Sequence, residues 1–182
     1  MAGNGKRPTN RARLVSSVIF MAVLFCATAP GCGSRGGLSD FERAQKKKDD
    51  AASALRALGG EVTTVNYPAY GDGWAVKLRG AQISKDVFDH LKELKRVAEL
   101  DLSKSTITDD QLVRLNEAEV GALIVKLDLS HTAVTDAGVD TLKLSLLTQL
   151  NLTGTKVSAA AVDRLKKHRA LDPRLPAFQV VR

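Results

Sequence analysis

One spaced pattern of apolar residues occurs four times between residues 76 and 165. Each copy has an alternating apolar pair, then an apolar residue followed by Ser or Thr, then two apolar residues three positions apart. The copies begin at Val76, Leu100, Leu127 and Leu150 and end at Leu91, Leu115, Leu142 and Leu165. Repetition at a period of about 20 to 30 residues is typical of stacked solenoids. The pattern predicts the architecture of the chain but does not identify what the chain binds.

The spacing within a copy predicts a strand, a turn and a helix. Two apolar residues at alternate positions, such as Leu100 and Leu102, share one face of a strand. Two that are three apart, such as Leu112 and Leu115, share one face of a helix. Because one copy cannot bury both faces, neighbours must stack, with a parallel sheet on the concave side and helices on the other. The expected fold class is α/β.

Polar residues mark the expected helix starts. Hydroxyl residues that can accept hydrogen bonds from first-turn amides are Ser84, Thr108, Thr135 and Ser158. Aspartates near the positive helix ends are Asp86, Asp109, Asp110 and Asp136. Thr108 and Gln111 also have the spacing of a capping box. We interpret this series as structural and not catalytic.

The third copy, LDLSHTAVTDAGV at residues 127–139, and a further apolar residue three positions before later strand pairs carry a family likeness. Those further residues are Val97, Ile124 and Leu147. The copies resemble bacterial leucine-rich repeats of the helix-bearing, ribonuclease-inhibitor-like kind, over residues 74–167. The resemblance implies a short solenoid of about four repeats that binds protein or peptide along its strands. The usual Asn or Cys near the strand end is replaced by Ala81, Ser105, Thr132 and Thr155. The Ser and Thr hydroxyls are expected to bond backbone groups there, whereas Ala81 cannot.

The repeats, expected over residues 74–172, need a cap at each end. Residues 39–73 are expected to form an N-terminal helix and strand, and 173–182 a C-terminal cap strand. The first helix should begin at a Ser39–Glu42 capping box and end at Gly59-Gly60. Its apolar residues are Phe41, Ala44, Leu55 and Leu58, and the β-branched Val62, Thr64 and Val65 indicate the strand that follows. The C-terminal segment has Pro173 and Pro176 as helix breakers and Phe178, Val180 and Val181 as apolar strand residues. The longest step between copies, 27 residues, predicts an exposed turn at residues 116–119.

The first 32 residues have the layout of an export signal: a basic start, an apolar stretch from Leu14 to Ala29, and a turn-like close at Pro30-Gly31-Cys32. This junction resembles that of a bacterial lipoprotein precursor, which implies lipid attachment at Cys32. Ordinary signal cleavage and an uncleaved anchor are the alternatives. Residues 33–38 are small and flexible enough for a tether. The expected location is the cell envelope, membrane-anchored through the lipid, or else secreted or periplasmic.

The net charge of +7 gives little reason to expect a nucleic-acid partner. Four basic and no acidic residues precede Cys32, so the remainder has 23 basic and 20 acidic residues and a net charge of +3. No basic stripe with interleaved aromatics follows.

The histidines, which are the candidates for catalysis or metal binding, occupy different positions within the repeat. His90 lies on a predicted helix, His131 follows a strand and His168 ends the last helix, so they should not converge. The sequence has no nucleophile elbow and no glycine-rich phosphate loop. We therefore predict a protein that is not an enzyme, with no cofactor and no metal.

The residues that alternate with the strand leucines should line the concave face in rows. The first row is Ala75, Glu99, Lys126 and Gln149, the second Lys77, Asp101, Asp128 and Asn151, and the third Arg79, Ser103, Ser130 and Thr153. The charged and amide members are the possible binding face, and a solvated surface is the alternative. Asp101 beside Asp128 is unfavourable without a cation or basic partner, which makes this pair the sharpest local signal.

Two other segments have a functional and a structural interpretation. An aromatic loop is expected at residues 67–74, either sealing the N-terminal cap or stacking on a peptide or glycan. The basic run at residues 166–169 either suits a helix C-terminus or contacts a membrane. The sequence favours a non-enzymatic protein-protein interaction module, with a self-associating structural component of the cell envelope as the alternative.

Overall fold

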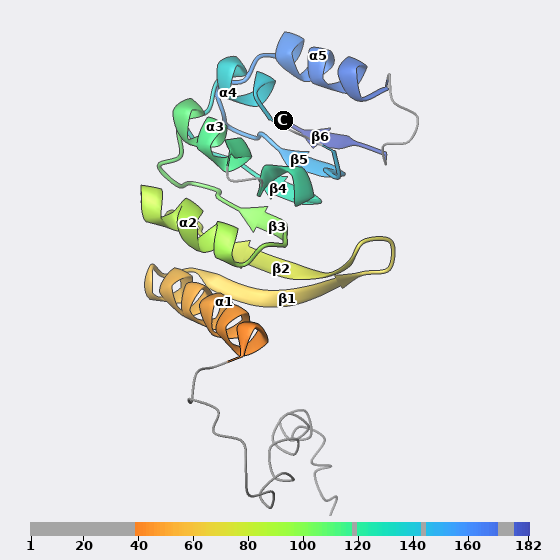
Figure 1. The fold of residues 1–182 in the computed structure, drawn as a ribbon. Helices are drawn as coiled ribbons and strands as arrows, with labels where there is room; N and C mark the ends of the chain where they lie inside the picture. Colours follow the sequence, from red (N-terminus) through yellow and green to blue (C-terminus); the bar gives the residue numbers. More distant parts are fainter. Residues whose placement is uncertain (1–38, 118–119, 143–144, 171–176) are drawn as a thin grey trace, which may run out of the picture. The chain divides into compact units, whose positions relative to one another are not determined.

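The computed structural model describes residues 39–117, 120–142, 145–170 and 177–182. These residues form one α/β unit with a six-stranded sheet whose strands follow the order of the chain (Figure 1). The predicted α/β class is confirmed. The expected export signal, Cys32, the tether, Pro173 and Pro176 lie outside the described residues.

The unit opens with a helix and a strand hairpin and then alternates strands with helices. The helices are α1 (Asp40–Ala57), α2 (Lys85–Glu93), α3 (Asp109–Glu117), α4 (Asp136–Asp140), α5 (Ala159–Ala170) and a short 3-10 helix, η1 (Gly121–Leu123). The strands are β1 (Glu61–Tyr67), β2 (Gly71–Lys77), β3 (Val97–Asp101), β4 (Lys126–Asp128), β5 (Gln149–Asn151) and β6 (Gln179–Val181).

The sheet is mostly parallel. β1 and β2 form an antiparallel hairpin, and β2 to β6 run parallel, each beside the next. Helices α2 to α5 lie in a layer on one face of this sheet (Figure 1). The opposite face is called the polar face below.

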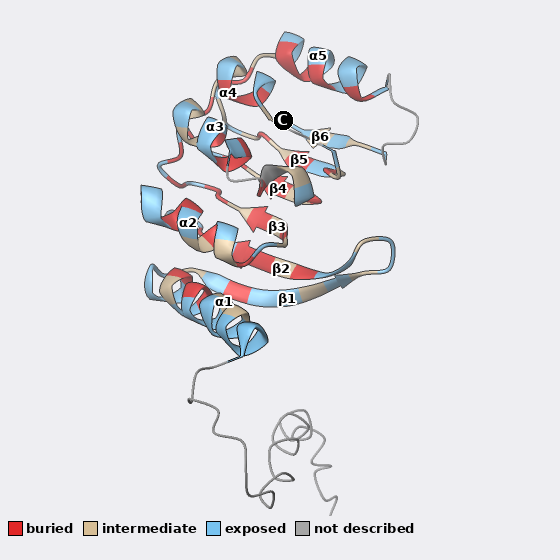
Figure 2. Cartoon of the chain, in the orientation of Figure 1, coloured by how far each residue is buried: buried red, intermediate tan, exposed pale blue. Residues whose placement is uncertain are grey.

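The apolar positions of the four copies form the core, and Figure 2 shows that buried residues occur on the strands and on the helices beside them. All of them are buried except Leu142, which is half-buried. The added positions Val97, Ile124 and Leu147 are buried as well. The spacing therefore identified the core correctly, because side chains at alternate strand positions and at three-residue helical spacing share a face.

Hydrogen bonds between successive copies join the helix starts. Asp109 of α3 accepts from both the backbone amide (2.9 Å) and the hydroxyl (2.6 Å) of Thr135, ahead of α4. Asp136 of α4 accepts in the same way from Ser158, ahead of α5, at 2.5 and 2.6 Å. These aspartates were predicted to stabilise their own helices. In the structure they also bind the start of the next helix.

The predicted hydroxyl caps form in part. Thr135 accepts from Ala137, and Ser158 accepts from Ala161. Gln111 supplies one arm of the predicted capping box by accepting from the Thr108 amide. The prediction for Ser84 was wrong, because its side chain makes no capping hydrogen bond.

One residue in each copy has a left-handed backbone, just after the strand. The four equivalent positions are Gly80 (φ 70°), Lys104 (φ 58°), His131 (φ 56°) and Gly154 (φ 69°). The amides of the first three continue the sheet ladder by donating to the neighbouring copy at 2.8–2.9 Å. Because this conformation is costly for residues with a Cβ, Lys104 and His131 are strained where the glycines are not.

The N-terminal cap has the expected helix and strand. Ser39 and Glu42 form the predicted capping box, and the amides of Gly59 and Gly60 close the helix end by donating to Arg56 and Leu55. Only the second half of α1 packs against the core, through Ala51, Ala52 and Leu55. Of the apolar residues named for this segment, Leu55 is buried, whereas Phe41 and Leu58 are 78% and 48% exposed.

Two expected loops are ordered differently. The aromatic segment 67–74 is not a loop throughout, since β1 extends to Tyr67 and β2 begins at Gly71, inside the cap expected to end at residue 73. The exposed turn predicted to start at Asn116 is also wrong. Asn116 lies in α3, is buried, and donates from Nδ2 to the Thr141 carbonyl at 2.7 Å.

The strand predicted in the C-terminal segment is present as β6, beside β5. Phe178 and Val180 pack against the core, whereas Val181 is 58% exposed. In the basic run, Arg169 is buried. It donates to the Leu147 carbonyl at 2.6 Å and lies 5.1 Å from the centre of the Phe178 ring. The run lies at the end of α5, as the helix C-terminus interpretation predicted, and Arg169 also has a structural role in the core.

Candidate functional site: a groove across the polar face

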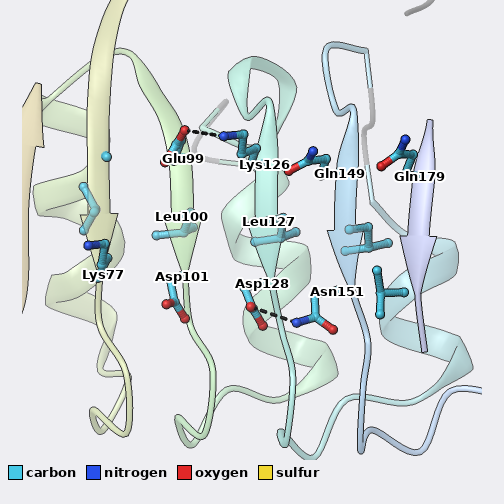
Figure 3. Close-up of a pocket in the computed structure, with 14 residues that line it drawn as sticks. Lys77, Glu99, Leu100, Asp101, Lys126, Leu127, Asp128, Gln149, Asn151 and Gln179 are labelled. Atoms are coloured by element: carbon cyan, nitrogen blue, oxygen red, sulfur yellow. Dashed lines mark hydrogen bonds and ion pairs between the residues drawn. The ribbon is translucent and has the colours of Figure 1, made fainter. Parts of the chain in front are cut away.

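A groove of about 420 Å³ crosses the polar face over β2 to β6 (Figure 3). Its polar rows follow the strand register that the sequence predicted. The first row is Ala75, Glu99, Lys126 and Gln149, extended by Gln179 of β6. The second is Lys77, Asp101, Asp128 and Asn151, extended by Val181. We call this region, with these residues, the sheet groove.

The third predicted row leaves the sheet groove. Ser103 and Ser130 are buried, and Arg79 lies at the rim, where its Nε donates to the Ser103 hydroxyl at 3.2 Å. Of the predicted binding residues, Arg79 is therefore the one outside the groove lining. The strand leucines beneath the rows are buried and form the groove floor.

The second row is fixed by bonds to its own backbone. Asp101 Oδ1 accepts from the Ser103 amide at 2.9 Å, Asp128 Oδ1 from the Ser130 amide at 2.8 Å, and Asn151 Oδ1 from the Thr153 amide at 3.1 Å. An Asp or Asn that bonds the amide two residues ahead forms an Asx turn. The three side chains therefore have set orientations.

The outer oxygens of the two aspartates have different neighbours. Asp101 Oδ2 lies 3.6 Å from Arg79 Nε, which is an ion pair without hydrogen-bond geometry. Asp128 Oδ2 accepts from the neutral Asn151 amide at 2.9 Å. Figure 3 shows both aspartates on adjacent strands. The predicted Asp101–Asp128 juxtaposition is confirmed.

Tyr67, Glu99 and Lys126 form a cluster on the side of the sheet groove where the first row lies. Glu99 accepts from the Tyr67 hydroxyl and lies 3.0 Å from Lys126 Nζ, which is also 5.7 Å from the centre of the Tyr67 ring. Tyr67 is the last residue of β1, and its hydroxyl reaches Glu99 of β3 from the far side of β2. Sequence reasoning placed Tyr67 in a cap loop and missed this contact. The available signal was the alternation of Thr63, Val65 and Tyr67 on one face of a strand.

The contacts in this cluster shift all three pKa values. Burial raises the pKa of Tyr67, and its hydrogen bond to Glu99 adds to the rise. Burial also raises the pKa of Glu99, but hydrogen bonds from Tyr67 and Lys126 outweigh it, so the pKa lies below its usual value. The bond to Glu99 raises the pKa of Lys126. At neutral pH the cluster is a neutral phenol, a carboxylate and an ammonium.

At the end of the sheet groove formed by β5 and β6, the lining side chains are more exposed than at the other end. Gln149, Gln179 and Val181 are exposed, and β6 carries the latter two. Sequence reasoning did not include Gln179 in the face and treated Val181 as a cap residue. β6 is separated from the fourth copy by residues 171–176, so the spacing of the copies could not predict its register with β5.

The three histidines lie on different elements: His90 on α2, His131 after β4 and His168 on α5. Among the described residues no three His, Cys, Asp or Glu side chains form a group that could hold a metal ion. None of the helices in this part of the chain is both long and apolar enough to span a membrane.

The chain matches no protein-family model, and the comparison with curated proteins found no match. The candidate site therefore depends on geometry alone. It offers a shallow surface of oriented carboxylates and amides with an aromatic corner, which suits an extended polar ligand.

Proposed function

We propose that this chain is a short leucine-rich-repeat solenoid that acts as a non-enzymatic protein-protein interaction module. The supporting features are four sequence copies whose strands are neighbours in chain order, helices on one face, and hydrogen bonds between equivalent positions of successive copies. A stack of this kind presents one continuous surface to a partner.

The observation that carries this proposal is the contrast between the groove floor and its lining. Buried leucines fix the strands, and backbone bonds fix Asp101, Asp128 and Asn151 above them. Side chains that are already ordered lose little conformational entropy when a partner binds.

Site-specific photo-crosslinking in the native cells would test the proposal. A photoreactive residue replaces Gln149 in the groove or, as the matched control, Asp163, which is exposed on α5. We expect one discrete crosslinked product from position 149 and not from 163. Equal products from both positions, or none from 149, would contradict binding through the polar face.

We further propose export and lipid attachment at Cys32, supported by the basic start, apolar stretch and cysteine of residues 1–32. Intact mass and fractionation of the parent and Cys32→Ser would test this. We expect a chain that begins at Cys32 with added acyl mass in the parent, and loss of that mass in the variant. Unmodified full-length protein in the cytoplasm would contradict it.

A self-associating structural role is the second candidate, favoured by the edges of the sheet. β1 and β6 each pair with one neighbour in the described unit, so each has one edge available for another strand. Light scattering over a range of concentrations distinguishes the two functions. A mass that grows with concentration supports assembly, whereas a constant monomer mass contradicts it.

A further inference from the structure

The cations and carboxylates of the sheet groove differ in how they are neutralised. Lys77 Nζ lies 3.0 Å from Glu61 Oε2, and Lys126 Nζ lies 3.0 Å from Glu99 Oε1. Each groove lysine therefore has a carboxylate partner within the chain. An anionic ligand would have to compete with these partners for both cations.

Asp101 and Asp128 are balanced less completely. Asp128 has an uncharged hydrogen-bond partner, Asn151, and Asp101 has only the looser 3.6 Å contact with Arg79. The Arg79 side chain is 65% exposed and its Nε already donates to Ser103. Solvent screening weakens an ion pair of this kind. The second row of the groove consequently carries an excess of negative charge.

We propose that the sheet groove binds an extended, arginine- or lysine-rich segment of a partner protein, with its cationic side chains on Asp101 and Asp128. This inference rests on the proposed interaction function and specifies the chemistry of the partner. The complementarity is one of charge: the groove lysines are paired with carboxylates, whereas the outer oxygens of Asp101 and Asp128 have only a loose ion pair and a neutral donor and can each accept a further hydrogen bond.

The geometry suits a guanidinium group particularly well. The two aspartates are register partners on adjacent parallel strands, which lie about 4.8 Å apart. A guanidinium has five donors in a rigid fork and can contact two neighbouring carboxylates. Because the Oδ1 atoms are held by backbone amides, the Oδ2 atoms are already oriented. The exposed Gln149 and Gln179 can bond the main chain of the segment.

Fluorescence anisotropy with short labelled peptides and the full-length chain would test the proposal. The probe alternates arginine with serine, and the control peptide alternates glutamate with serine. We expect the arginine peptide to bind, with affinity falling as salt is added, and the glutamate peptide to bind more weakly by roughly tenfold or more.

Two variants test the residues. Asp128→Asn removes the charge but retains an oxygen for the Ser130 amide, and should weaken the arginine peptide roughly five- to tenfold. Asn151→Asp replaces the donor to Asp128 Oδ2 with a second carboxylate, and it should tighten binding of the arginine peptide because a cation would relieve the added repulsion. The matched control is Asp163→Asn on α5, which should change nothing. Thermal melting of each variant verifies that it is folded.

Equal binding of both peptides, or an unchanged affinity in Asp128→Asn, would overturn the inference. Crosslinking from position 149 without binding of the arginine peptide would contradict the proposal of a cationic partner segment. It would not contradict the proposed interaction function. Failure of both experiments would overturn both proposals.

Discussion

The two faces of the sheet follow different rules. On the helix side, every copy repeats the same apolar positions, and nearly all of them are buried. On the polar face, equivalent positions hold Glu99, Lys126 and Gln149 in successive strands. Packing dictates residue type on the first face because a change there opens a cavity or buries a polar group. On the second face, side chains can differ from copy to copy, which leaves room for recognition.

The largest effect should come from a charge placed on the packed face. Leu129 is fully buried, so Leu129→Asp places an unpaired carboxylate between copies and should cost several kcal/mol, roughly 4 or more. A substitution on the polar face supplies the control, because Gln149→Ala, at an exposed position, should stay within about 0.5 kcal/mol of the parent. Thermal unfolding measures both. Similar melting of Leu129→Asp and the parent would show that the two faces are wrongly assigned.

The next effect concerns the bonds that join helix starts. Asp109→Ala leaves the amide and hydroxyl of Thr135 without their acceptor and should lower the free energy of unfolding by about 1–3 kcal/mol. Asp110→Ala is the control, since Asp110 shares the first turn of α3 and is exposed. Urea denaturation of the two variants gives the loss in the free energy of unfolding for each. The difference between them separates the hydrogen bonds between copies from the helix-dipole effect. Equal losses in the two variants would assign the whole effect to the dipole.

A smaller, pH-dependent effect should appear at the aromatic corner of the polar face. The folded-state pKa of Glu99 lies below the model-peptide value of 4.5, so its contribution is complete above that pH and disappears as pH falls through the folded pKa. Glu99→Gln should therefore be less stable than the parent at pH 7 by about 1 kcal/mol or less, and this difference should shrink in acid. Denaturation at a series of pH values measures it. A stability difference that stays constant with pH would contradict the lowered pKa of Glu99 and the hydrogen bonds that cause it.

The smallest effect concerns the left-handed residue that follows each strand. Lys104→Gly should stabilise the fold by roughly 0.5–1 kcal/mol, because relief of the strain exceeds the entropy that glycine loses. The reverse change at the equivalent position, Gly80→Ala, should destabilise by about 1 kcal/mol; an added Cβ there meets no atom within 4 Å, so only backbone strain is tested. Thermal unfolding of both variants checks the opposite signs. The same sign for both would contradict the shared conformation.

Prediction from sequence succeeded where a residue's environment depends on its own spacing. The core and the faces on which the polar rows lie follow from the spacing within each copy, and the capping box at Ser39 follows from its Ser-x-x-Glu motif. It failed where the environment depends on another copy. Asn116 was expected at the surface, yet its amide is buried against Thr141, 25 residues away. Ser105 was expected to bond the backbone as Thr132 does, but its buried hydroxyl has no hydrogen-bond partner among the described residues.

The sequence by itself determined the α/β class, the buried residues and the rows of polar side chains, because a period of two in strands and about 3.6 in helices fixes which side chains share a face. Tertiary structure alone decided which polar groups meet. The reach of Tyr67 to Glu99, the bond from Asp109 to Thr135 and the extension of the groove by β6 each join elements that are distant in the chain. Such contacts are set by the register and stacking of whole elements, which no single segment encodes.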